Sequence, residues 1–199
     1  MLEDTVELPR LYLAWHSPPI FEPGDAELDL VADLLAEGKS SRLYKTLVYE
    51  GRQAPDVTAV QQSRVLSGFF QLIATAAPGH GLAELDDIIT DEIARVAVEG
   101  PTAAELERSL AQAEAHFVYR LQTVGGFGGK SDQLNQYNVF VGDPGFSGRD
   151  LERYRGANAA SVRAAAGSVL AAAPRVALSV VPRGRLDLAL PDSVKVVCS

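Results

Sequence analysis

The chain has 199 residues, 47% of them hydrophobic and 22% charged, which is typical of a globular domain with a sizeable core. Its formal net charge of −8 argues against a nucleic-acid backbone or an anionic membrane as main partner, since both attract basic surfaces. No apolar run approaches the length that spans a bilayer. The one cysteine, Cys198, excludes an internal disulfide and a thiolate metal cluster, and we interpret it as incidental.

The first elements predicted are a strand and two helices. Residues 10–16 are rich in β-forming side chains and stop at two prolines, which indicates a strand. An amphipathic helix follows, with Asp25 as its N-cap and Gly38 at its end, because glycine enters the left-handed region without steric cost. Ser40 or Ser41 can cap the next helix by accepting a bond from a free backbone N–H.

A hairpin comes next. Residues 57–65 and 68–76 are β-rich and are separated by a short link, which favours two paired strands. Both faces of the second run carry apolar side chains, so we expect this strand to be central and covered by helices.

Helices dominate the second half. Thr102 and Glu105 form a capping-box pattern after Pro101, which predicts a helix boundary, and Ser131 can cap a later helix. The predicted helices span residues 82–98, 102–121, 131–141, 150–154 and 159–173, and a last strand spans 175–181. Strands and helices are segregated along the chain, so we predict an α+β domain with a mainly antiparallel sheet and helices packed on one face.

Several segments resemble the M16 metallopeptidase family, which includes insulinase, pitrilysin and the mitochondrial processing peptidase. Residues 38–49 (GKSSRLYKTLVY) are similar to its "G-x-S-S-R-L-y-k-x-L-v" signature. Four later segments resemble family patterns in the same order: Gly68-Phe69-Phe70-Gln71-Leu72, residues 99–106, residues 142–162, and the closing strand at 176–182. The resemblance therefore covers nearly the whole chain.

The resemblance implies a LuxS/MPP-like metallohydrolase fold and, more narrowly, the inactive C-terminal domain of an M16 subunit. Residues 1–199 would then form a single domain, a fragment of a larger peptidase chain. Family enzymes hold zinc with an H-x-x-E-H helix, because two histidines one turn apart reach one ion while the glutamate activates water.

The histidines do not supply such a site. His16, His80 and His116 lie far apart in the sequence. His80 and Glu84 have a one-turn spacing but no third ligand, so we interpret His80 as a loop residue before a helix. We interpret His16 as a strand residue, and His116 as a helix-surface or satisfied core residue. We expect no cofactor in this chain and zinc in a partner domain.

The family also has an arginine and a tyrosine, seven residues apart, that hold the substrate carbonyl near zinc. The positions that match this pair are Val48 and Pro55, and neither side chain can donate a hydrogen bond. We therefore predict no catalytic residue here, and any such pair would come from another domain or subunit.

The glycine cluster at residues 125–130 also invites a functional interpretation. A phosphate loop, G-x-x-x-x-G-K-S, would need glycine at position 124, which is Val124, and would follow a strand rather than a helix. A hinge between helices is the simpler interpretation, and contact with a peptide or partner is a further possibility. The predicted contact residues are Ser40, Ser41, Arg42, Gly126, Phe127 and Gly128.

Two functions follow as hypotheses. The first is a noncatalytic domain of an M16B-type zinc endopeptidase, which forms part of a substrate chamber and contacts a zinc-bearing domain in the same chain or a paired subunit. Its partners would be that domain and a peptide substrate, without nucleic acid or membrane insertion. The alternative is an inactive M16-like assembly subunit. The alanine-rich, lysine-poor composition suggests a bacterial source, and the compartment stays open between periplasm and cytoplasm.

Overall fold

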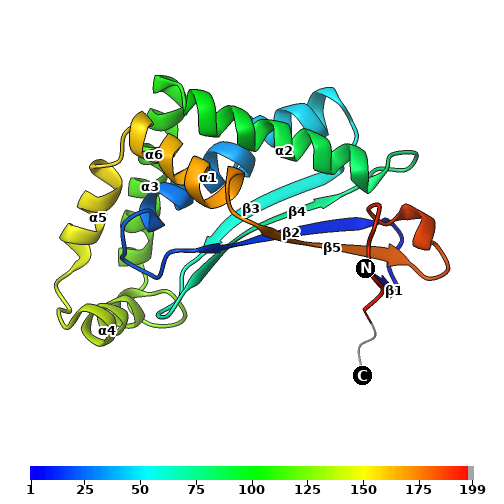
Figure 1. Cartoon of the computed structure of the whole chain (residues 1–199). Helices are drawn as coiled ribbons and strands as arrows, with labels where there is room; N and C mark the ends of the chain where they lie inside the picture. The colour runs from blue at the N-terminus through cyan, green and yellow to red at the C-terminus, as the bar shows by residue number, and fades with distance from the viewer. Residues whose placement is uncertain (197–199) are drawn as a thin grey trace.

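The computed structural model describes residues 1–196 and shows one layer of helices packed on one twisted sheet (Figure 1). Five strands lie in the order β1-β5-β2-β4-β3. Their bounds are β1 Leu2–Asp4, β2 Arg10–Ser17, β3 Asp56–Gln62, β4 Gly68–Thr75 and β5 Arg175–Pro182. Neighbouring strands pair antiparallel except β1 and β5, which are parallel. The predicted α+β class and the predicted hairpin are confirmed.

The helices occupy the stretches predicted for them. The α-helices are α1 Asp25–Ala36, α2 Leu82–Glu99, α3 Ala103–Gln122, α4 Lys130–Val141, α5 Ser147–Arg155 and α6 Ala159–Ala165. Two π-helical segments, η1 Tyr44–Glu50 and η2 Ala166–Ala171, and one short 3-10 turn, η3 Leu186–Leu188, complete the described elements. None of the helices in this part of the chain is both long and apolar enough to cross a bilayer.

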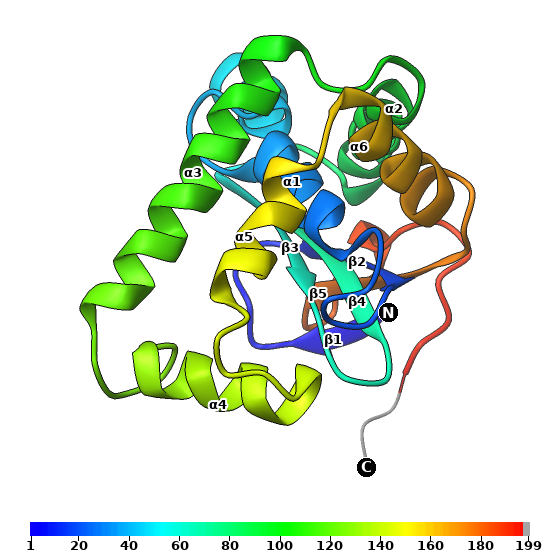
Figure 2. The same cartoon turned by 90° about the vertical axis from the view of Figure 1, so that its left-hand side faces the viewer.

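The core lies between the sheet and a helical layer that includes α1, α2, α6 and η2. On α1, Leu28, Val31 and Leu35 are fully buried, at the one-turn spacing of an amphipathic helix. They meet the alternate residues of β2 and β4 that point to the same side, which are Leu11, Leu13, Trp15, Phe70, Leu72 and Ala74. Helix α1 also contacts β3 of the sheet, and it is surrounded by α3, α5 and α6 (Figure 2).

The opposite face of the sheet carries no helix of the described chain (Figure 1). Helices were expected to cover β4 because both of its faces are apolar, but they cover only the face of Phe70, Leu72 and Ala74. Phe69 is partly exposed on the other face. Apolar residues on the second face thus do not belong to this core.

Three other differences from the sequence expectations are local. The strand β1 was not predicted as a separate element, because three residues carry no pattern and the partner strand lies near residue 180. Asp25 is not a cap: Gly24 holds that position, and the Asp25 side chain is buried in a polar network. Ser131 lies inside α4, whose cap is Gly129. Cys198 lies outside the described residues.

Candidate functional site

The corner between α1 and η1 is held by its own side chains. Gly38 has a positive φ of 75°, as predicted for the end of the first helix. The hydroxyl of Ser41 is buried and donates to the carbonyl of Gly38 at 2.7 Å, so it does not cap the following helix as expected. Ser40 is exposed. Substrate or partner contact by these serines stays a prediction.

Arg42 ties this corner to the junction of α2 and α3. Its guanidinium donates to both carboxylate oxygens of Glu105, at 2.9 and 2.8 Å, and to the carbonyl of Gly100 at 3.0 Å. Glu105 also completes the predicted capping box with Thr102, which is confirmed. The Arg42 hydrogen bonds lower the pKa of Glu105 to about 2. In this geometry the Arg42 side chain is fully engaged within the fold, and its predicted contact role stays a prediction.

The positions that match the family arginine and tyrosine both precede β3. Val48 belongs to η1 and packs against the core, whereas Pro55 is exposed directly before the strand. Backbone N–H groups of Gln53 and Ala54 both bond the carbonyl of Leu47, at 2.8 and 3.1 Å, and close the turn between these positions. Neither Val48 nor Pro55 offers a side-chain donor at this edge of the sheet.

The glycine cluster forms the loop between α3 and α4. Two backbone bonds close its base, from Lys130 N to Thr123 O at 2.7 Å and from Ser131 N to Val124 O at 3.1 Å. Gly126 and Gly128 have positive φ values of 84° and 74°, which favour glycine. Phe127 stands between them and is fully exposed. The loop therefore presents one aromatic side chain at its tip.

The histidines lie in three different places. His16 faces the uncovered side of β2, and His116 is exposed on α3. Nδ1 of His80 lies 2.9 Å from Oε2 of Glu84, whose other oxygen accepts a bond from Gln53 at 2.8 Å. Within residues 1–196 no group of three or more His, Cys, Asp or Glu side chains is placed to hold a metal ion.

The uncovered sheet face carries two rows of side chains that cross four strands. Residues directly opposite in a ladder share a face, so Tyr12 aligns with Ile73 and Leu178, while Ala14 aligns with Val176 and Gln71. On β3 the rows continue to Thr58 and Val60. Val60, Phe69 and Val176 are exposed, and the face holds mainly apolar and neutral groups. The next row on this face, Arg10, Thr75 and Asp56, carries two charges, so the uncharged rows lie beside charged groups.

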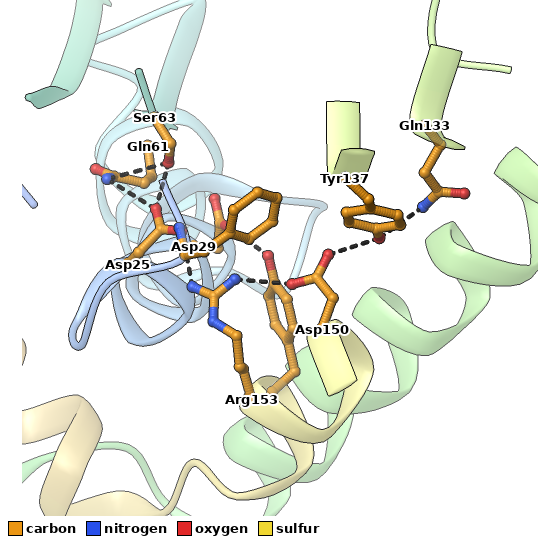
Figure 3. A network of polar contacts seen from close by, with 10 residues as sticks. Asp25, Asp29, Gln61, Ser63, Gln133, Tyr137, Asp150 and Arg153 are labelled. Carbon is orange, nitrogen blue, oxygen red and sulfur yellow. Dashed lines mark hydrogen bonds and ion pairs between the residues drawn. The ribbon is translucent and has the colours of Figure 1, made fainter. Parts of the chain in front are cut away.

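A polar network that sequence reasoning missed joins α1, β3, α4 and α5 at one end of the sheet (Figure 3). Arg153 of α5 donates to Asp25 at 2.8 Å and to Asp150 at 2.7 Å. Asp150 also accepts a bond from Tyr137 at 2.8 Å, and Tyr137 accepts one from Gln133 at 3.0 Å. The network fixes α4 and α5 against α1.

Asp25 is the acceptor at the centre of that network. Its two oxygens also receive bonds from the backbone N–H of Phe21 at 3.0 Å, from Gln61 at 3.3 Å and from the hydroxyl of Ser63. Because these partners come from the loop before α1 and from β3, the residue orders the start of α1 rather than capping it. No local pattern predicts this role, since the side-chain partners Gln61, Ser63 and Arg153 lie 36, 38 and 128 residues away in sequence.

Asp29 lies one turn further along α1 and accepts a bond from the hydroxyl of Tyr154 at 2.6 Å. Burial raises the pKa of Asp29 to about 7, with smaller contributions from the negative charges of Asp25 and Asp33. Burial likewise raises the pKa of Asp33 to about 6. Both carboxyl groups therefore take up protons near neutral pH.

Asp29→Asn should stabilise the protein at pH 8. A raised carboxyl pKa gives stability that is present below about pH 4 and lost as pH rises through 7, and an amide has no such loss. Because Asp29 is only partly buried, we expect a gain of about 1–2 kcal/mol at pH 8 that shrinks towards pH 5. Urea unfolding at both pH values measures it, with exposed Asp91→Asn as control. An equal gain at both pH values would contradict the assignment.

The fold is a helix-on-sheet domain, and its described residues include no group of three or more His, Cys, Asp or Glu side chains placed to hold a metal ion. The family model for the Peptidase M16 inactive domain matches residues 1–113. The chain therefore belongs to the M16 peptidase inactive-domain family. No curated protein matches the sequence.

Solved structures share the fold at low identity. A protease from Helicobacter pylori superposes with a TM-score of 0.80 at 21% identity, over 92% of this chain and 43% of that one. The inactive peptidase domain of a candidate zinc protease from Bordetella parapertussis gives 0.77 at 23% identity, over 90% of this chain and 94% of that one. A chain of Complex III2 from Candida albicans gives 0.76 at 17% identity, over 90% and 44%. This chain thus spans less than half of the Helicobacter and Candida chains.

Proposed function

We propose that this chain is the noncatalytic domain of an M16B-type zinc endopeptidase, and that it forms part of the substrate chamber and contacts a zinc-bearing domain. The observation that carries this proposal is the uncovered sheet face, with its rows of apolar and neutral side chains through Tyr12, Ile73 and Val176. Apolar groups that lie outside their own core favour a contact surface. On this proposal the face lines the chamber and meets extended peptide.

Strand β3 offers a place for such a peptide. It is the last strand in the sheet order, so one of its edges has no strand beside it in the described chain. An extended peptide can add to a free edge through main-chain hydrogen bonds, a mode that tolerates many sequences. Val60 and Thr58 on the uncovered face would then contact alternate side chains of the peptide.

The loop at the end of α3 is a second contact element in this proposal. Gly126 and Gly128 place the exposed ring of Phe127 at its tip, while the closed base limits the entropy lost on contact. Ser40 is available at the exposed corner, whereas Ser41 and Arg42 would act by holding that corner in shape. The partner would be the zinc-bearing domain.

The domain assignment is also part of this proposal. Residues 1–199 would be one domain of a larger assembly, either as part of a longer chain or beside a paired subunit. The coverage of 43% of the Helicobacter pylori chain supports this, because a chain of that length has room for further domains. Zinc would reside in the partner domain, where an H-x-x-E-H helix supplies the ligands.

Hydrogen exchange tests the role of β3. Adding an unstructured peptide of about 20 residues should slow exchange of backbone amides in residues 56–62, because an added strand pairs with them. Val60→Asp should weaken peptide binding about tenfold, since it places a charge in the contact. Val98→Asp, at an exposed position of α2, is the matched control. Protection confined to the helices, or equal weakening by both variants, would refute the proposal.

A zinc titration tests the noncatalytic assignment separately. The isolated chain with stoichiometric zinc should cleave no peptide, because the described residues offer no set of three ligands. Tight zinc binding accompanied by turnover would overturn it.

A second candidate function is an inactive structural subunit of a larger complex. The similarity to a chain of Complex III2 from Candida albicans favours it. The two functions differ in their partners: a peptidase domain pairs with a protein that carries H-x-x-E-H, and an assembly subunit does not. Purification of the chain with its native partner, followed by a peptidase assay, distinguishes them.

A further inference from the structure

A cleft on the helical side of the molecule is separate from the sheet face discussed above. Helices α1, α3 and α5 enclose about 460 Å³, a volume within the range of small-ligand sites. Its lining combines acidic, aromatic and basic side chains, among them Asp29 and Asp33 from α1, Phe117 and Arg120 from α3, and Tyr154 from α5. Figure 2 shows these three helices side by side.

The α1 wall of the cleft is acidic. Asp29 and Asp33 are spaced by one helical turn, which places them on one face of α1, and Glu37 follows as the C-cap residue. Among the described residues, none of the three has a Lys or Arg nitrogen within salt-bridge distance. Asp29 accepts only the neutral hydroxyl of Tyr154. Partly buried carboxylates without a paired cation are costly, and a bound cation would offset that cost.

The other walls of the cleft suit the hydrocarbon part of an organic cation. Phe117 and Tyr154 meet edge to face, with ring centroids 5.4 Å apart, and both line the cleft. Aromatic rings contact alkyl chains and attract cations. Opposite them, Nε of Arg120 donates to the carbonyl of Gly128. Partial burial lowers the pKa of His116, with Arg120 as the second cause. Asp150 is already paired with Arg153.

We propose that this cleft binds an alkylammonium group, as carried by a free diamine or by a lysine side chain. The ammonium would lie between Asp29 and Asp33 and donate to both, while the alkyl chain would lie along Phe117 and Tyr154. The proposal is independent of the chamber function, because the cleft lies on the other side of the sheet. The ligand would form a direct ion pair with the α1 carboxylates, which Arg153 and Arg108 influence only from beyond salt-bridge distance of Asp29 and Asp33.

Binding should depend on pH in a defined direction. The free carboxyl groups of Asp29 and Asp33 hold protons up to about pH 7 and 6, and a bound ammonium favours their ionised forms. Binding therefore releases protons, and affinity should rise about tenfold from pH 5.5 to 8. The other charged groups around the cleft are Glu37 and Asp25 of α1, Arg108, His116 and Arg120 of α3, and Asp150 and Arg153 of α5.

Isothermal titration calorimetry of the whole chain tests the proposal with three probes. These are 1,5-diaminopentane, Nα-acetyl-lysine N-methylamide and the uncharged 1,5-pentanediol. Binding of either amine at least about tenfold tighter than the diol supports the site. Tighter binding of the diamine identifies a free amine as ligand, and tighter binding of the lysine amide identifies a peptide side chain. Equal binding of the diol, or no binding of either amine, overturns the proposal.

Variants of the cleft complete the test. Asp33→Asn keeps the shape of a half-buried side chain and removes its charge, so amine affinity should fall at least about tenfold. Asp29→Asn is the second variant, in case Asp33→Asn alters the fold as judged by circular dichroism. Asp91→Asn, at an exposed position of α2, should leave affinity unchanged. Unchanged affinity in both cleft variants would overturn the assignment.

Discussion

Arg153→Met should lower the free energy of unfolding by about 3–5 kcal/mol, the largest effect expected of any single charge in this protein. Arg153 pairs with Asp25 and Asp150, whose side chains are 4% and 10% exposed. Removing the guanidinium leaves both carboxylates desolvated and without a cation. Methionine retains much of the side-chain length, so the loss reports on charge rather than on packing. Urea unfolding at pH 7 measures it.

Two further variants identify the cause. Arg149→Met removes an arginine of the same helix that is 66% exposed, and it should cost less than about 1 kcal/mol. Adding Asp25→Asn to Arg153→Met should recover part of the lost stability, because one of the two buried, unpaired carboxylates is removed. If Arg153→Met and Arg149→Met cost the same, the network does not hold α5 against α1.

Arg42→Met should destabilise the protein by about 2–3 kcal/mol at pH 7, since a partly buried bidentate ion pair is lost. The Arg42 and Glu105 side chains are 15% and 18% exposed. The hydrogen bonds from Arg42 depress the pKa of Glu105 to about 2, below the usual 4.5. This stability is therefore present above about pH 4.5 and is lost as pH falls towards 2.

The difference between Arg42→Met and wild type should consequently shrink as pH falls from 5 to 2. Arg155→Met is the matched control, because Arg155 also bonds two glutamates but is 48% exposed. It should cost less than about 1 kcal/mol at pH 7. A pH-independent cost for Arg42→Met would show that packing, and not the ion pair, joins the corner to the α2–α3 junction.

Local signals predicted most of the fold. The Thr102–Glu105 box, the glycine at position 38 and the β-rich runs before and after position 67 each act over a few residues, and the structure confirms the boundaries they indicate. The two misplaced caps differ in cause. The Asp25 side chain could cap a helix but bonds Arg153 and other distant groups instead, whereas Ser131 lies inside α4 because the helix already begins at Lys130.

The candidate sites were less accessible from the sequence. The glycine cluster at residues 125–130 indicates a loop between two helices, because several glycines in a row interrupt a helical pattern. In the sequence, the uncovered sheet face is visible only as apolar side chains on both faces of β4, a pattern that predicts helix coverage on both sides. The Asp25–Arg153 contact spans 128 residues, and the cleft carboxylates look like ordinary surface acids of an amphipathic helix. Such assemblies depend on how distant segments meet.

The pairing of β1 with the last strand brings the two ends of the described chain together. The carbonyl of Met1 accepts a bond from the amide of Val196 at 2.9 Å, and the first three-residue strand runs beside β5 in the same direction. A domain whose two ends lie close together can be joined head to tail, circularly permuted or inserted into another polypeptide without separating the sheet from its helices.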